Sequence, residues 1–175
     1  MADTLDLIER SFEKIKPNAI AFSNCFYQHL FQNSPELKPM LAEVSPELQQ
    51  KKLVASLALI VENLHNPSAL SHALQWLGAH HVTKGTEKDH YPLVGQALLQ
   101  ALEDYLGEDW TAEVADAWLK AYQLISNIML EGTHHPEAHL KGELTFYEWL
   151  DLYGEMSPSF RELVKSTTHF KYGVH

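Results

Sequence analysis

Apolar residues recur every three or four positions along most of the chain. The runs are Leu5, Ile8, Phe12, Ile15; Phe22, Phe26, Leu30; Leu53, Leu57, Ile60, Leu64; Leu70, Leu74, Leu77; Val94, Leu98, Leu102, Leu106; and Val114, Trp118, Ala121, Ile125, Ile128. This spacing matches the 3.6-residue period of an amphipathic helix, and no stretch shows the sustained alternation of a strand. The pattern therefore predicts an all-α protein.

Helix starts are marked by a repeated signal in which a small polar residue precedes a proline. The pairs are Ser34-Pro35, Ser45-Pro46, Asn66-Pro67 and Ser157-Pro158. Such a residue caps a helix, and proline fits the first helical position. We expect about seven helices, one of them short, in a domain over residues 1–132. A break after Gly132 separates a C-terminal extension, residues 133–175, for which we expect two short helices and a loose tail.

Composition excludes several classes of function. The 175 residues carry 13 Lys and Arg against 23 Asp and Glu, a net charge of −10, which disfavours binding to nucleic acid or to anionic membranes. The longest apolar run, Leu57 to Val61, is too short to span a bilayer, and no signal peptide is visible, so we expect a cytoplasmic protein. The one cysteine, Cys25, allows no internal disulfide and no cysteine-based zinc cage, and we expect it to be a buried core thiol.

Three polar residues occupy positions where the apolar pattern demands a buried side chain. His81 extends the series Leu70, Leu74, Leu77, Gln49 stands four residues before Leu53, and Tyr27 shares a helix face with Leu30. Each taken alone is more often an ordinary structural residue. Together they provide one basic nitrogen and two hydrogen-bond donors facing inward, and one histidine suffices to hold a metal when a haem supplies the other four nitrogens.

Three blocks of sequence carry a more specific signal. They are His81 to Leu99, which includes Tyr91-Pro92-Leu93-Val94-Gly95; Asp116 to Tyr122; and Phe26 to Phe31 followed by Pro35-Glu36. In these blocks the chain resembles the bacterial globins, specifically the single-domain and flavohaemoglobin-type branch. The resemblance extends over roughly residues 4–132. It implies the globin fold, a sandwich of three helices on three, around a haem b group with its iron.

The resemblance also implies a role for individual residues. His81 corresponds to the proximal ligand of the iron, and Tyr27 and Gln49 correspond to donors on the opposite, distal side. The remaining residues expected to line the cofactor are Leu41, Lys52, Leu53, Leu77, Tyr91 and Val94. Lys52 matches a position that often meets a haem propionate, although a solvated lysine explains it equally well.

Two positions depart from the family pattern. Leu41 stands where these globins normally place a phenylalanine against the haem. Thr133 stands where a glutamate joins the proximal tyrosine and histidine in a hydrogen-bonded relay, and Glu131 would face about 200° away from it. Without this carboxylate, we expect the proximal histidine to donate less electron density to the iron. We therefore also expect less cleavage of the oxygen–oxygen bond.

The function that these residues favour is reversible binding of oxygen and other diatomic gases. Nitric oxide dioxygenation is compatible with the same site but needs a separate reductase, because the sequence contains no Gly-x-Gly-x-x-Gly motif. The main alternative is a gas sensor that signals to a partner through residues 133–175. The same extension is explained equally well as a cover for an apolar patch. Two weaker alternatives are a haem-free globin-like module and a metal site at His134, His135 and His139.

Overall fold

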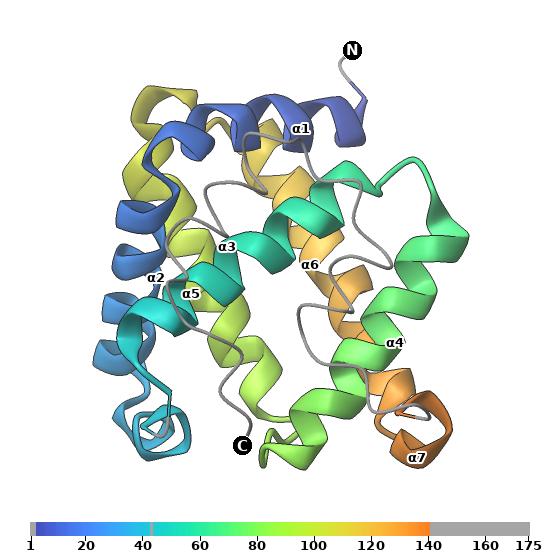
Figure 1. Cartoon of the computed structure of the whole chain (residues 1–175). Coiled ribbons are helices and arrows are strands. Elements are labelled where there is room, and N and C mark those ends of the chain that lie inside the picture. The colour runs from blue at the N-terminus through green and yellow to red at the C-terminus, as the bar shows by residue number, and fades with distance from the viewer. Residues whose placement is uncertain (1–2, 43, 141–175) are drawn as a thin grey trace.

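A computed structural model of the chain describes residues 3–42 and 44–140, and it is built from helices (Figure 1). The α-helices are α1 (Thr4–Ile15), α2 (Ala19–Asn33), α3 (Pro46–Glu62), α4 (Pro67–Thr83), α5 (His90–Leu106), α6 (Ala112–Gly132) and α7 (Pro136–His139). Short 3-10 turns occupy Lys16–Asn18, Pro35–Leu37, Pro39–Leu41 and Gly107–Asp109. The described residues contain no strand, so the all-α prediction is confirmed. The two helices and the tail expected beyond residue 140 lie outside the described part of the chain.

The predicted helix starts are found at α3 and α4. The Ser45 hydroxyl accepts a hydrogen bond from the Leu48 amide at 3.2 Å, and the Asn66 side chain accepts one from the Ala69 amide at 3.4 Å. Ser34 makes no such bond, and the segment after it is a 3-10 turn rather than an α-helix. Capping therefore fixes where the two helices that carry most of the predicted site begin.

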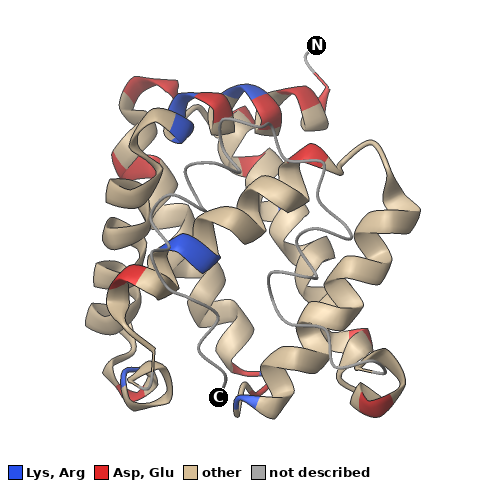
Figure 2. Ribbon diagram, viewed as in Figure 1, with Lys and Arg blue, Asp and Glu red and all other residues tan. Residues whose placement is uncertain are grey.

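The helices form two layers of three. In Figure 1, α3 crosses in front of α5 and α6, while α1 runs along one end and α4 lies beside α6. The closest helix pairs are α4 with α6 and α2 with α5, whereas α3 and α4 approach each other only weakly. Helix α4 contains no lysine, arginine, aspartate or glutamate, as the uncoloured ribbon in Figure 2 shows. None of the described helices is long and apolar enough to cross a membrane.

Two glycines allow α4 and α6 to cross at close range. A Cβ atom on Gly78 would lie 1.9 Å from the Met129 carbonyl oxygen, and one on Gly132 would lie 2.1 Å from the Gln75 carbonyl oxygen. Any larger side chain would therefore push the two backbones apart. This crossing sets the position of the last turns of α4, where His81 lies.

The core is made by the inward faces that the apolar pattern predicts. Ile8, Phe12 and Ile15 of α1 are at most 2% exposed. A buried polar contact joins α1 to α6, since the Trp118 indole nitrogen donates to the Ser11 hydroxyl at 2.8 Å. The hydroxyl in turn bonds to carbonyl groups of its own helix, so the buried polar atoms of this contact are satisfied.

Candidate functional site

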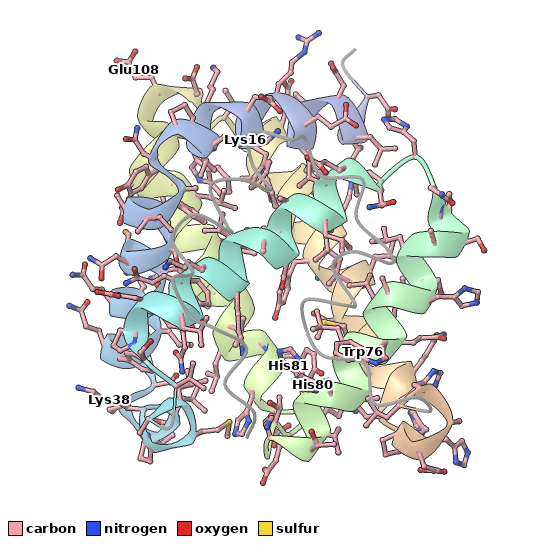
Figure 3. All side chains as sticks on the ribbon, in the orientation of Figure 1. Lys16, Lys38, Trp76, His80, His81 and Glu108 are labelled. Carbon is pink, nitrogen blue, oxygen red and sulfur yellow. The ribbon has the colours of Figure 1, made fainter. Side chains whose placement is uncertain are left out.

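His81 lies in the last turns of α4, on the interior side (Figure 3). Its Nδ1 atom is 2.7 Å from the Leu77 carbonyl oxygen, which can only accept a hydrogen bond. Burial lowers the pKa of His81, while the bond to Leu77 raises it by a smaller amount, so the ring is neutral at pH 7. Nδ1 then carries the proton and Nε2 keeps its lone pair. The carbonyl orients the ring and leaves a nitrogen that can ligate a metal.

Tyr91 and Tyr122 join α5 to α6 through a hydrogen bond. The Tyr122 hydroxyl donates to the Tyr91 carbonyl oxygen at 2.5 Å. The Tyr91 hydroxyl is itself buried and has no hydrogen-bond partner, and burial raises the pKa of Tyr91. A buried hydroxyl without a partner is uncommon in a folded protein.

The departure at Thr133 is visible in the structure. The Thr133 hydroxyl donates to the Leu130 carbonyl oxygen at 2.6 Å, at the end of its own helix. Glu131 is exposed and lies 3.4 Å from the Gln75 side chain. Neither residue is bonded to Tyr91, so the described residues provide no carboxylate for a relay to this tyrosine.

Tyr27, Gln49 and Leu41 come together where α2 meets the start of α3. The Tyr27 hydroxyl donates to the Gln49 backbone carbonyl at 3.3 Å, and the Gln49 side-chain amide donates to the Leu41 carbonyl at 2.5 Å. Phe26 and Phe31 contact the Tyr27 ring, with centroids 4.9 and 5.9 Å away. Burial strongly raises the pKa of Tyr27, so its hydroxyl is a neutral donor.

The hydrogen bond made by Tyr27 is long. Bonds between a hydroxyl and an oxygen are usually about 2.7–2.8 Å, whereas this one measures 3.3 Å. A weak partner is easily exchanged, so the hydroxyl is able to turn toward a better acceptor. Gln49 has the stronger bond and would need its amide released from Leu41 before donating elsewhere.

Lys52 of α3 is influenced electrostatically by a basic group at the end of α4. Burial lowers the pKa of Lys52, and the positive charge of Lys84 at the end of α4 lowers it further. Burial also lowers the pKa of His80 to about 4, with smaller effects from His81, Lys84 and Lys52. The positive charges of Lys84 and Lys52 thus act on His80, and that of Lys84 acts on Lys52. Lys84 was not among the predicted residues, although its position three residues after His81 puts it on the same helix face.

His80 does not share the environment of His81. Its ring stacks on the Trp76 ring, with centroids 5.0 Å apart and planes inclined by 9°. Figure 3 shows both side chains near the end of α4. The stack holds the His80 ring against its own helix, whereas the hydrogen bond to Leu77 belongs to His81.

The remaining predicted residues are apolar and come from separate elements. Leu41 lies in a 3-10 turn, Leu53 in α3 and Val94 in α5, and each packs on the core yet is only partly buried. Leu77 in α4 is buried, with 5% of its surface exposed.

One expectation from the sequence is wrong. Cys25 was expected to be a buried core thiol, but it packs against the core while only partly buried, and its thiol donates to Asp104. His134, His135 and His139 do not gather into a metal-binding group within the described ranges. His29 pairs with Asp104 of α5, its Nε2 atom lying 2.6 Å from a carboxylate oxygen.

Comparison with known proteins agrees with this geometry. The globin family model matches residues 24–129. The flavohemoprotein of Rhizobium meliloti is 30% identical over 128 residues, covering 72% of this chain and 32% of that protein. The flavohemoprotein of Rhodopirellula baltica is 28% identical over 138 residues, covering 77% and 34%. The chain thus spans about a third of the length of these relatives.

Two solved structures share the fold. One is an engineered carbene transferase derived from a putative nitric oxide dioxygenase of Rhodothermus marinus, with a TM-score of 0.69, 29% identity and coverage of 78% of this chain and 95% of the other. The second is a bacterial globin from Campylobacter jejuni, with a TM-score of 0.66, 25% identity and coverage of 77% and 97%. With a family model that matches more than half of its residues, the chain belongs to the globin family.

Proposed function

We propose that the chain binds haem b through His81 and takes up oxygen and other diatomic gases reversibly. The observation that carries this proposal is the His81 ring, which is neutral, held at Nδ1 by the Leu77 carbonyl and left with a ligating Nε2. Haem iron held by one histidine binds diatomic gases at its open position.

The residues predicted to line the cofactor fit such a group by their chemistry. Haem is flat and apolar over most of its area, and Leu53, Leu77 and Val94 present apolar side chains from three helices. Haem also carries carboxylates, and Lys52 and Lys84 supply positive charge between α3 and α4. Leu41 takes the place of the usual aromatic residue and keeps the wall apolar, with a smaller contact area.

Tyr27 and Gln49 act on the distal side. Both donors stand on the elements that face α4 across the fold, and both are already close to each other through the Gln49 carbonyl. A hydrogen bond to a ligand that carries partial negative charge contributes about 1–3 kcal/mol. Because about 1.4 kcal/mol is a tenfold change, two such bonds slow gas release by orders of magnitude.

The proximal side favours gas binding over oxygen–oxygen bond cleavage. Cleavage is promoted by a ligand histidine made more basic by a hydrogen-bonded carboxylate. Here the Nδ1 atom of His81 is bonded to a neutral carbonyl, and the Tyr91 hydroxyl has no carboxylate partner. His81 therefore remains an ordinary neutral imidazole.

Nitric oxide dioxygenation is the enzymatic activity that the same site could support. Slow oxygen release suits it, and a structural relative is described as a putative nitric oxide dioxygenase. The reaction needs electrons to return the iron to the ferrous state. With no nucleotide-binding Gly-x-Gly-x-x-Gly motif in the sequence, these electrons would come from a reductase outside the 175 residues.

A gas-sensing role is supported by one further observation. Helix α7 packs against α4, the helix that carries His81 (Figure 1). A shift of α4 on gas binding would thus also move α7, at the start of residues 133–175. This alternative is tested by measuring the affinity of the protein for a partner with and without carbon monoxide. A sensor requires the two affinities to differ.

The central test is the visible absorption spectrum of the purified protein in ferric, ferrous and carbon monoxide forms. We expect a haem spectrum in the parent protein and loss of pigment in His81→Ala. His80→Ala is the matched control, since it removes the neighbouring imidazole, and it should keep the pigment and the carbon monoxide affinity. A colourless parent protein that takes up no added haem, or a His81→Ala variant with unchanged pigment and gas affinity, would refute the proposal.

A further inference from the structure

A second group of metal-ligating side chains lies at the surface between α2 and α5. It consists of Cys25, His29 and Asp104, whose ligand atoms all lie within 4.8 Å of one another. The Cys25 Sγ atom is 3.5 Å from an Asp104 carboxylate oxygen, and the His29 Nε2 atom is 2.6 Å from the same oxygen. No other such group exists among the described residues.

Helix geometry explains why these residues meet. Cys25 and His29 are four positions apart on α2, so they lie on one face one turn apart, and Asp104 is in the last turn of α5. The two helices run antiparallel and are among the closest pairs in the fold, as Figure 1 shows.

Contacts on both sides hold this seam in register. Toward one end, the Phe22 and Tyr105 rings meet edge to face with centroids 5.8 Å apart. Toward the other end, the Asn33 side-chain amide donates to Gln100 at 2.7 Å. The three potential ligands are therefore positioned by the fold before any ion arrives, which reduces the ordering that binding requires.

We propose that Cys25, His29 and Asp104 form a binding site for Zn²⁺, with water as the fourth ligand. A thiolate, an imidazole nitrogen and a carboxylate oxygen are the three donor types that zinc prefers, and three protein ligands with one water is a common arrangement at open zinc sites. The thiolate and the carboxylate together balance the charge of the ion. The site is reachable from solvent, because Asp104 is exposed and the other two residues are partly exposed.

Binding requires only a small rearrangement. With zinc–ligand bonds of about 2.0–2.3 Å, tetrahedral ligands lie about 3.3–3.8 Å apart. The distance between Cys25 and Asp104 already falls in this range, while His29 and Asp104 would separate by about 1 Å as the ion replaces their hydrogen bond. The Cys25 thiol loses its proton to solvent. The Nε2 proton of His29, which now bonds to Asp104, also leaves to solvent, the ring keeps a proton at Nδ1, and the freed Nε2 lone pair ligates the ion. Zinc would then bridge α2 and α5.

The test uses the fact that Cys25 is the only cysteine in the sequence. The full-length protein is treated with iodoacetamide, with and without one equivalent of Zn²⁺, and alkylation of Cys25 is followed by mass spectrometry. We expect zinc to slow alkylation strongly in the parent protein and to have no effect in His29→Gln or Asp104→Asn. His65→Gln is the matched control, because His65 forms an exposed pair with Glu9 at 2.7 Å but has no thiol nearby; this variant should be protected like the parent.

Zinc affinity gives a second measurement that does not depend on thiol chemistry. In competition with a chromophoric chelator, the parent should bind one zinc ion that Cys25→Ser does not. Loss of an outer-shell partner already weakens metal sites about 10–100-fold, so loss of a direct ligand should lower affinity about 100-fold or more. Alkylation that zinc leaves unchanged, protection that survives both His29→Gln and Asp104→Asn, or equal zinc affinity in Cys25→Ser would overturn the proposal. Circular dichroism checks that each variant is folded.

Discussion

The crossing of α4 and α6 at Gly78 permits a prediction whose size follows from the structure. In Gly78→Ala, the new Cβ atom would lie 1.9 Å from the Met129 carbonyl oxygen, whereas real Cβ atoms essentially never come closer than 3.0 Å to another heavy atom. The clash is with backbone, so no side chain can move aside. The two helices must separate by roughly 1 Å, as expected for an overpacked contact.

Two effects of opposite sign determine the expected change in stability. Overpacking costs about 1–3 kcal/mol. Alanine is favoured over glycine within a helix by about 0.5–1 kcal/mol, which offsets part of that loss. We expect the free energy of unfolding to fall by about 1–2 kcal/mol, and the melting temperature of a protein of this size to fall by about 2–8 °C.

The assay is urea unfolding followed by circular dichroism, together with the haem content of the purified variant. His81 lies three residues after Gly78 on the same helix, so displacement of α4 should also increase haem loss. His72→Ala is the control, since it places alanine at an exposed position of α4 and should change stability by no more than about 0.5 kcal/mol. A Gly78→Ala variant as stable as the parent would refute the argument, because the contact with Met129 could then not be as close as described.

Three further predictions concern single hydrogen-bonding groups. Burial raises the pKa of Tyr122 to about 12, above the usual value near 10. The contribution of Tyr122 to the free energy of unfolding is therefore present below pH 10 and is lost as the pH rises toward 12. In Tyr122→Phe, the decrease in the free energy of unfolding between pH 9 and pH 12, measured by urea unfolding, should be smaller than in the parent by up to about 2–3 kcal/mol. Ser11→Ala leaves the buried Trp118 indole N–H without its acceptor and should lower the free energy of unfolding by about 1–3 kcal/mol. The double variant Ser11→Ala/Trp118→Phe should lose much less stability than the sum of the losses in the two single variants. Tyr27→Phe should speed oxygen release about tenfold or more in stopped-flow experiments, because it removes one distal donor; an unchanged rate would show that Tyr27 does not reach the gas ligand.

Much of the fold was predictable because it depends on local periodicity. The spacing of Ile8, Phe12 and Ile15 predicts an amphipathic helix with these residues inside, and all three are buried. Caps at Ser45 and Asn66 likewise act within one turn of the chain. Such signals are contained in short stretches of sequence, so they are read without knowing the packing.

Cys25 shows where this reasoning fails. Its place close to Tyr27 on α2 predicted a buried thiol, yet the residue is partly exposed and donates to Asp104, 79 residues away in sequence. The burial of a helix face depends on which helix covers it and on how far the cover extends. That information lies in the pairing of α2 with α5.

The sequence by itself determined that the chain is helical, where its main helices begin, and that His81, Tyr27 and Gln49 stand at unusual polar positions on apolar faces. Only the tertiary structure decided that the Tyr27 hydroxyl meets the Gln49 carbonyl, that the charge of Lys84 lowers the pKa of Lys52, and that Tyr91 has a buried hydroxyl without a partner. The reason is physical: helix formation is governed by neighbours within four residues, whereas these meetings depend on how helices distant in sequence cross and pack.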